Sequence, residues 1–369
     1  MKSLRLRLTS RRPVRLLAAC VAALLASSAV AAWSIAGAAA ASSHRQAPGQ
    51  GGSWLEYAPY FETWTSDKLP VIAQESGARD LTLAFLQTPR RGSCAVAWNG
   101  ERKQEVKPGG RYVGQIATLR KMGGDVIPSF GGYSADQGGT EIADSCKSVS
   151  KIAKAYETVV TTYDVTRLDM DVEARSLNNK AGIARRSEAI AQLQQWAAAN
   201  HRPLQIVFTL GVEPQGLPGN CLNILKSAVA HGVKIAAVNI MAFDYYNSNS
   251  DSDMGTEAIE SLNATHAQLA KLFPDLNSFQ LWRMLGITLL PGIDDFPKKT
   301  EVTYPSEVQD VLYYARDHPV SLITIWAIQR DNGHCPGTID SNSCSGITQP
   351  RWDFSKLIES MIGPIPAGG

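Results

Sequence analysis

The sequence predicts an α/β protein built on a (β/α)8 TIM barrel, in a single domain that follows a signal peptide. Two observations predict this fold. Eight short apolar runs alternate with longer stretches of helical periodicity. Roughly 310 residues follow the N-terminal export segment and the short linker after it, enough for one such barrel. A doubly wound open sheet is the alternative, but no glycine-rich phosphate loop follows the first expected strand.

The expected strands are short and apolar. In order they are Leu55–Tyr60, Leu81–Leu86, Val126–Phe130, Arg167–Asp171, Gln205–Leu210, Ile235–Met241, Met284–Leu289 and Ser321–Trp326. Amphipathic stretches lie between them, among them Glu141–Thr161, Arg185–Ala199, Leu222–His231, Thr256–Leu272 and Pro305–Asp317. Because the chemistry of such barrels lies at the C-terminal ends of the strands, polar and aromatic residues at those ends are the candidate site.

The N-terminus is typical of an exported protein. Basic residues precede a Leu/Ala-rich run that starts at Leu16 and ends in small residues suited to signal peptidase. We expect a signal peptide at 1–41, a flexible linker at 42–53, the barrel at 54–362 and a tail at 363–369. The protein is then secreted, without stable membrane association after cleavage. Twin-arginine export, a lipoprotein box ending at Cys20 and an uncleaved membrane span stay open.

The charge of the mature chain argues against polyanionic partners. The whole chain carries a net charge of +2, and residues 1–41 contain six basic and no acidic side chains, so their removal leaves −4. No basic field remains that would indicate nucleic acid or an anionic membrane surface as a partner. We expect a monomer.

Five cysteines lie beyond the signal peptide, and an oxidising compartment favours pairing among them. Cys335 and Cys344 bracket a loop rich in Gly, Ser, Asn and Pro and are the first expected pair. Cys94 with Cys146 is the second. Cys221 is left over, and we interpret it as a buried or idle thiol because no His and Asp pattern supports a nucleophile.

The most informative segment is the acidic strip at residues 168–173, which reads Leu-Asp-Met-Asp-Val-Glu. Its period of two gives a strand an apolar face and a face that carries Asp169, Asp171 and Glu173, about 6.6 Å apart along the strand. Carboxylates so close repel one another, so at least one should hold a proton near neutral pH, as general acid catalysis requires. A solvated acidic edge strand and a metal site are the alternatives, although the strip lacks the glycine and further ligands of a calcium loop.

Other strand ends carry further motifs that accompany the strip. They are Ser129-Phe130-Gly131-Gly132, Met241-Ala242-Phe243-Asp244-Tyr245 and Trp326. Together with Thr166–Glu173 they resemble, in the same order, the S-x-G-G, M-x-x-D-Y, closing tryptophan and D-G-x-D-x-D-x-E motifs of family 18 glycoside hydrolases, the chitinases and their relatives. The resemblance spans about residues 54–362. The first Asp and the Gly of the central motif are absent here, where Thr166 and Arg167 stand.

The resemblance implies a retaining mechanism in which the substrate supplies the nucleophile. Glu173 would protonate the glycosidic oxygen and later activate water. The acetamido oxygen of the −1 sugar would attack its own anomeric carbon. Asp171 would hold the acetamido N–H and stabilise the oxazolinium intermediate, and Asp169 would share a proton with Asp171.

The resemblance also implies substrate contacts, but no cofactor and no metal. Asp244 and Tyr245 are expected to hydrogen-bond the acetamide and the acid cluster, and Trp326 to form the floor under the −1 sugar. Tyr60 and Trp64 are candidates for outer subsites. Met241 and Gly131 complete the expected binding residues.

The expected function is therefore hydrolysis of β-1,4 bonds in chitin or N-acetylchito-oligosaccharides by a secreted glycoside hydrolase. Two alternatives stay open: an endo-β-N-acetylglucosaminidase acting on N-glycans, and a catalytically weak chitin-binding lectin. A metal-dependent barrel enzyme is less favoured, because no expected strand ends in His.

Overall fold

The structure, a computed structural model, describes residues 55–246, 253–295, 299–339 and 341–362. The expected signal peptide, linker and tail lie outside these residues. Within the described residues no helix is both long and apolar enough to cross a membrane.

Parallel strands close into a barrel. They are β1 (Glu56–Tyr57), β2 (Tyr60–Glu62), β3 (Asp80–Gln87), β5 (Asp125–Gly131), β6 (Arg167–Val172), β7 (Gln205–Gly211), β8 (Ala237–Met241), β9 (Leu285–Leu289) and β12 (Leu322–Ile325). Their order is β1-β12-β9-β8-β7-β6-β5-β3-β2, and the short β4 (Ala97–Trp98) pairs antiparallel with β3. Because β1 and β2 are consecutive pieces of one segment, the two ends of this order meet and the sheet closes, as predicted.

The first strand is one expected segment but two observed pieces. Leu55–Tyr60 was predicted as a single strand, whereas β1 pairs with β12 and β2 pairs with β3. Pro59 lies between the pieces and has no N–H to donate, so the regular ladder is interrupted there. Isolated hydrogen bonds continue the pairing on both sides of this interruption. Ala58 N–H donates to the Ile323 carbonyl, and Thr82 N–H donates to the Pro59 carbonyl.

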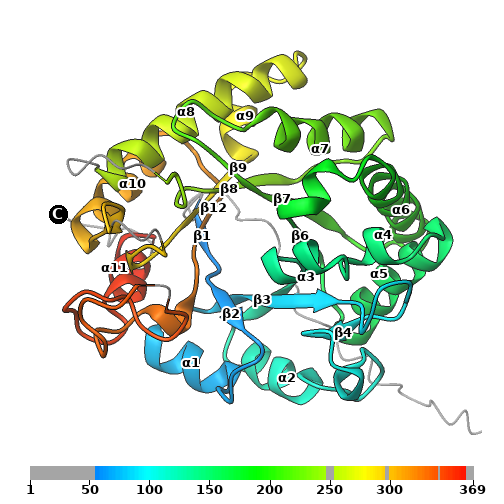
Figure 1. The fold of residues 1–369 in the computed structure, drawn as a ribbon, viewed down its shortest axis with the longest axis horizontal. Coiled ribbons are helices and arrows are strands. Elements are labelled where there is room, and N and C mark those ends of the chain that lie inside the picture. Colours follow the sequence, from blue (N-terminus) through cyan, green and yellow to red (C-terminus); the bar gives the residue numbers. More distant parts are fainter. Residues whose placement is uncertain (1–54, 247–252, 296–298, 340, 363–369) are drawn as a thin grey trace, which may run out of the picture. The chain divides into compact units, whose positions relative to one another are not determined.

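Helices lie around the strands (Figure 1). They are α1 (Leu69–Ser76), α2 (Val113–Lys121), α3 (Tyr133–Gly138), α4 (Ile142–Ser145), α5 (Val149–Tyr163), α6 (Lys180–Ala199), α7 (Gly219–Ala230), α8 (Met254–Leu272), α9 (Ser278–Arg283), α10 (Pro305–Asp317) and α11 (Asp353–Ile362). Short 3-10 turns follow β6 at Ala174–Asn178 and β12 at Ile328–Arg330. A two-stranded hairpin, β10 (Gly292–Ile293) with β11 (Val302–Thr303), follows β9.

The prediction of one helix over Glu141–Thr161 was wrong, because this segment contains α4 and α5 separately. Cys146 ends α4 in an extended conformation, with φ −87° and ψ 128°. Ser148 then starts α5 as its N-cap by accepting the N–H of Lys151. An extended residue followed by a serine cap divides the helix even though the apolar periodicity continues.

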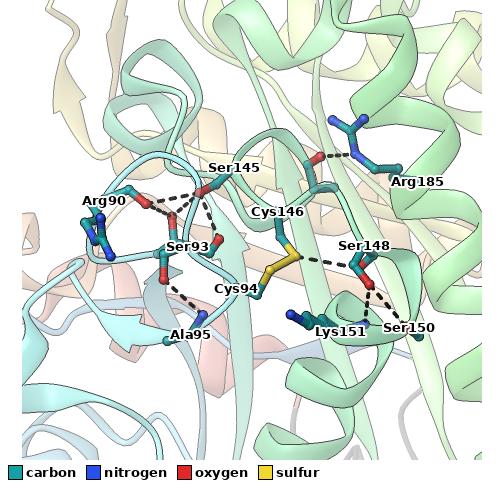
Figure 2. The surroundings of a disulfide bond; sticks show 12 residues. Arg90, Ser93, Cys94, Ala95, Ser145, Cys146, Ser148, Ser150, Lys151 and Arg185 are labelled. Carbon is teal, nitrogen blue, oxygen red and sulfur yellow. Dashed lines mark hydrogen bonds between the residues drawn. A yellow bond between two sulfur atoms is a disulfide. The ribbon is translucent and has the colours of Figure 1, made fainter.

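Both expected disulfides are present, Cys94–Cys146 and Cys335–Cys344, and Cys221 is free and buried. Figure 2 shows the first of them, which ties the segment between β3 and β4 to the break between α4 and α5. Beside it the Ser145 hydroxyl lies 3.0 Å from the Ser93 carbonyl oxygen. These links join the loops that follow β3 and β5 at the C-terminal ends of the strands.

The interior of the barrel has an apolar layer below a polar one. The apolar layer consists of Ala58, Ile127, Val207, Ala237 and Leu322. Two residues further along several of these strands stand polar side chains that are also buried: Ser129, Thr209, Asn239 and Thr324. Since alternate residues of a strand share a face, the polar layer lies nearer the C-terminal ends of the strands, under the candidate site.

Candidate active site

The acidic strip lies where the sequence predicts it, on β6 and directly after its end. Asp169 and Asp171 are each 2% exposed and share the inward face, while Glu173 follows the strand and is partly exposed. β6 lies between β5 and β7, with Asp169 in register with Ser129 and with Val207. The strip is therefore a central strand of the closed sheet, which excludes the solvated edge strand.

Asp169 accepts hydrogen bonds from three hydroxyl groups on three other strands. The donors are Ser129 Oγ at 2.6 Å, Thr209 Oγ1 at 2.7 Å and Tyr60 Oη at 3.0 Å. Burial raises the pKa of Asp169 to about 6, while these hydrogen bonds act in the opposite direction. Tyr60, expected at an outer subsite, is instead 2% exposed and belongs to this network inside the barrel.

Asp171 and Glu173 are both shifted toward the protonated form. Burial, together with the nearby negative charges of Glu173, Asp169 and Asp136, raises the pKa of Asp171 well above its ordinary value. Asp171 Oδ1 is buried without a hydrogen-bond partner among the described residues. Burial raises the pKa of Glu173 to about 7, partly offset by a hydrogen bond from the Tyr133 backbone N–H. A carboxyl group with this pKa can donate a proton near neutral pH.

This pKa predicts the alkaline limb of a pH–rate profile. A general acid acts in its protonated form, so kcat/KM should fall as pH rises through about 7 rather than through the ordinary glutamate value of 4.5. The measurement is kcat/KM between about pH 4 and about pH 9 at constant ionic strength. An alkaline limb near pH 4 to 5, which is about the ordinary pKa of a glutamate, would contradict the assignment of Glu173 as the general acid.

Trp326, directly after β12, lies at the centre of an aromatic cluster. Its ring stacks on Phe85 with centroids 5.4 Å apart, meets Tyr60 at 5.5 Å and Trp64 at 6.2 Å. Trp326 is partly exposed and Trp64 is 43% exposed, so the cluster reaches the surface. An exposed aromatic face of this kind can stack against the C–H face of a sugar.

Two consecutive glycines let the end of β5 pass close to β6. A Cβ on Gly131, at φ +104°, would lie 2.0 Å from the Asp171 carbonyl oxygen. A Cβ on Gly132, at φ +81°, would lie 2.5 Å from the Phe85 ring. Gly131, expected among the binding residues, therefore has a visible role in this close backbone approach.

Asp244 and Tyr245 leave β8 in a second acidic region. Asp244 N–H donates to Asp294 Oδ2 at 3.0 Å, and burial together with Asp294 and Asp295 raises the pKa of Asp244 to about 10. One oxygen from each of these three carboxyl groups lies within 4.8 Å of the others. The Tyr245 hydroxyl lies 3.0 Å from Ser261 Oγ on α8, and so is directed at a helix. Met241 and Trp326 pack against the same small apolar cluster.

Three residues near the site escape the sequence analysis. Phe85 stacks on Trp326, Asp136 accepts the N–H of Glu173, and Glu62 is buried at the end of β2 with its pKa raised to about 8 by burial. A register shift between Leu83 and Leu86 in β3 changes which residues face the site, so simple alternation could not place Phe85. For Asp136, the only sequence feature that could have indicated a role is its position shortly after Gly131 and Gly132.

The chain is similar in sequence to known proteins and to a protein family. The model of the family described as "Glycosyl hydrolases family 18" matches residues 56–278. The chain is 30% identical over 317 residues to a protein of Escherichia coli (strain K12) named "Probable bifunctional chitinase/lysozyme", covering 82% of this chain and 34% of that protein. It is 29% identical over 285 residues to "Endochitinase 11" of Metarhizium anisopliae, covering 74% and 52%. The chain thus spans about a third to a half of the length of these relatives.

The fold of the chain is also similar to that of solved chitinase structures. A solved structure of active domain 2 of a chitinase from Pyrococcus furiosus, in catalytic-site mutant form, superposes with a TM-score of 0.72 at 25% identity. The match covers 85% of this chain and 98% of that one. That domain is therefore matched over nearly its whole length.

Proposed function

The chain belongs to family 18 of the glycosyl hydrolases, and from this membership we propose that it is a secreted chitinase, which hydrolyses β-1,4 bonds between N-acetylglucosamine units. The observation that carries the proposal is the inward strip of Asp169, Asp171 and Glu173, in which Glu173 has a pKa of about 7 at the open end of the barrel. The names of the relatives, a chitinase/lysozyme and an endochitinase, support chitin as the substrate.

In the proposed mechanism the acids act in sequence. Glu173 donates its proton to the leaving glycosidic oxygen. At the same time the acetamido oxygen of the sugar in the −1 subsite attacks the anomeric carbon of that sugar. Asp171, whose Oδ1 has no partner among the described residues, is free to accept the acetamido N–H. Asp169, fixed by three hydroxyls, places a charge beside Asp171 that favours the positive intermediate. Glu173, now a carboxylate, then takes a proton from the attacking water.

Trp326 and its neighbours supply the floor of the proposed −1 subsite. Tyr60 links this cluster to the acids, because its ring lies 5.5 Å from that of Trp326 and its hydroxyl donates to Asp169 at 3.0 Å. Secretion is proposed from the basic and apolar N-terminal sequence. The two disulfides are consistent with it, because such bonds persist in oxidising compartments.

The test is hydrolysis of N-acetylchito-oligosaccharides by the protein from residue 42 onward, with the anomeric form of the first products followed by proton NMR. We expect cleavage with β-anomeric products, because the mechanism retains configuration. The matched control is the fully deacetylated oligomer, which lacks the acetamido nucleophile and should resist cleavage. Binding without cleavage would replace the chitinase by a lectin, and cleavage of N-glycans alone would replace it by an endo-β-N-acetylglucosaminidase.

A further inference from the structure

We propose that Asp136, on the short helix α3, is a positioning residue that holds the catalytic acid Glu173 in place. The proposal rests on the proposed function, because it assigns a role in the same reaction. Asp136 lies on a different element from the acidic strip and would not touch the substrate, since its side chain is 0% exposed.

Two contacts from α3 hold Glu173 at opposite ends of the residue. Asp136 Oδ2 accepts the backbone N–H of Glu173 at 2.5 Å. Tyr133, the first residue of α3, donates its backbone N–H to the Glu173 side chain. One helical turn therefore holds both the backbone and the carboxyl group of the acid. A group held at both ends keeps its orientation toward the scissile bond, which is the requirement for efficient proton transfer.

The position of α3 is itself tied to β6. Gly132 N–H donates to the Asp171 carbonyl at 3.2 Å, and Asp136 N–H donates to the Gly132 carbonyl at 3.0 Å. The close approach depends on Gly131 and Gly132, where any Cβ would collide with the Asp171 carbonyl or the Phe85 ring. The segment from Gly132 to Asp136 is thus hydrogen-bonded to Asp171 on β6 and to Glu173 directly after that strand.

The charges around Asp136 explain why a carboxyl group can serve here. Glu141, at the start of α4, and Arg186, on α6, form an ion pair of 2.9 Å with both side chains 2% exposed. Asp171, on β6, and Glu173, directly after it, are further acidic neighbours of Asp136. Burial and Glu141 raise the pKa of Asp136 well above its ordinary value, and Arg186 acts in the opposite direction. A neutral Asp136 can still accept the Glu173 N–H, so an amide of the same shape should replace it.

The test compares Asp136→Ala, which removes the acceptor, with Asp136→Asn, which keeps an acceptor oxygen. On N-acetylchito-oligosaccharides we expect kcat/KM to fall about 100-fold in Asp136→Ala and to stay within about 3-fold of wild type in Asp136→Asn. On a chitobioside of 2,4-dinitrophenol, whose leaving group needs no proton, the loss in Asp136→Ala should shrink to about 5-fold. General damage to the site would lower both activities equally.

The matched control is Asp144→Ala. Asp144 lies on α4 in the same region and accepts hydrogen bonds from Ser176 and Asn179, not from Glu173. Any activity that it loses should be the same for both leaving groups. Equal losses on both substrates in Asp136→Ala, or a loss in Asp136→Asn as large as in Asp136→Ala, would overturn the positioning role.

Hydrogen exchange gives a readout that needs no activity. The amide of Glu173 should exchange faster in Asp136→Ala than in wild type and at the wild-type rate in Asp136→Asn. An unchanged rate in Asp136→Ala overturns the proposal. If the wild type cleaves no acetamido sugar, the proposed function fails, and the exchange rates still decide whether Asp136 holds Glu173.

Discussion

Replacing Glu173 with glutamine is expected to lower kcat on N-acetylchito-oligosaccharides by about 10³-fold or more. Glutamine has the shape of the protonated acid and can keep the contact with the Tyr133 N–H, but it cannot release a proton. In the proposed mechanism Glu173 is the acid of the first step and the base of the second, so both steps would lose their proton transfer. The measurement is single-turnover and steady-state product formation by chromatography.

Binding separates loss of chemistry from loss of the site in this variant. Calorimetric Kd values for an N-acetylglucosamine tetramer should agree within about 3-fold between wild type and Glu173→Gln, since the change removes no volume. Glu157→Gln on α5, which alters a partly exposed side chain that pairs with Lys154, is the control for a glutamate change remote from the site. If Glu173→Gln kept more than about 10% of the wild-type activity, Glu173 could not be the general acid.

The second large effect concerns stability. Glu141→Gln should lower the free energy of unfolding by about 3 to 5 kcal/mol, because it leaves the charge of Arg186 buried without its partner. The ion pair is 2.9 Å long with both side chains 2% exposed, so water cannot replace the lost carboxylate. Glutamine keeps an oxygen for the N–H groups of Ala143 and Asp144, which isolates the ion pair from the helix cap. The measurement is the urea unfolding midpoint with its slope.

The same Glu157→Gln variant supplies the comparison on the surface. Lys154 and Glu157 form an ion pair of 2.5 Å in which the lysine side chain is 68% exposed, and its loss should cost less than about 1 kcal/mol. Equal effects of the two substitutions would show that Arg186 finds another partner when Glu141 loses its charge. Arg186→Met with Glu141→Gln should recover part of the lost stability, since no buried charge is then left alone.

The barrel was predictable because its strands are buried runs whose apolar residues alternate or repeat without interruption. Arg167–Asp171 and Gln205–Leu210 each fall within one residue of the observed strands β6 and β7. The prediction failed where a local feature overrides the pattern. Pro59 divides the first strand, and the extended residue Cys146 divides a helix whose apolar periodicity continues.

The acidic strip was predictable from the sequence, but its surroundings were not. Period-two alternation places Asp169, Asp171 and Glu173 on one face without any tertiary knowledge. The three hydroxyls on Asp169 come from residues 40 to 109 positions away, and nothing local in the sequence indicates those contacts. Asp136 is 37 positions from Glu173 and contacts its backbone N–H. Because every residue except proline has this N–H, the residue type at position 173 gives no indication of the contact.

The seam between the first and last strands also determines when the barrel can close during synthesis. β1 pairs with β12, with Glu56 opposite Leu322 and Tyr57 opposite Ile323, and Glu62 N–H donates to Gln329 Oε1 across 267 residues of sequence. A growing chain therefore carries β1 with an open edge until β12, at Leu322–Ile325, has been synthesised. Contacts so distant in sequence form slowly, and an open strand edge invites pairing with other chains. Pairing of this edge with other chains is therefore a hazard during synthesis, before the barrel closes.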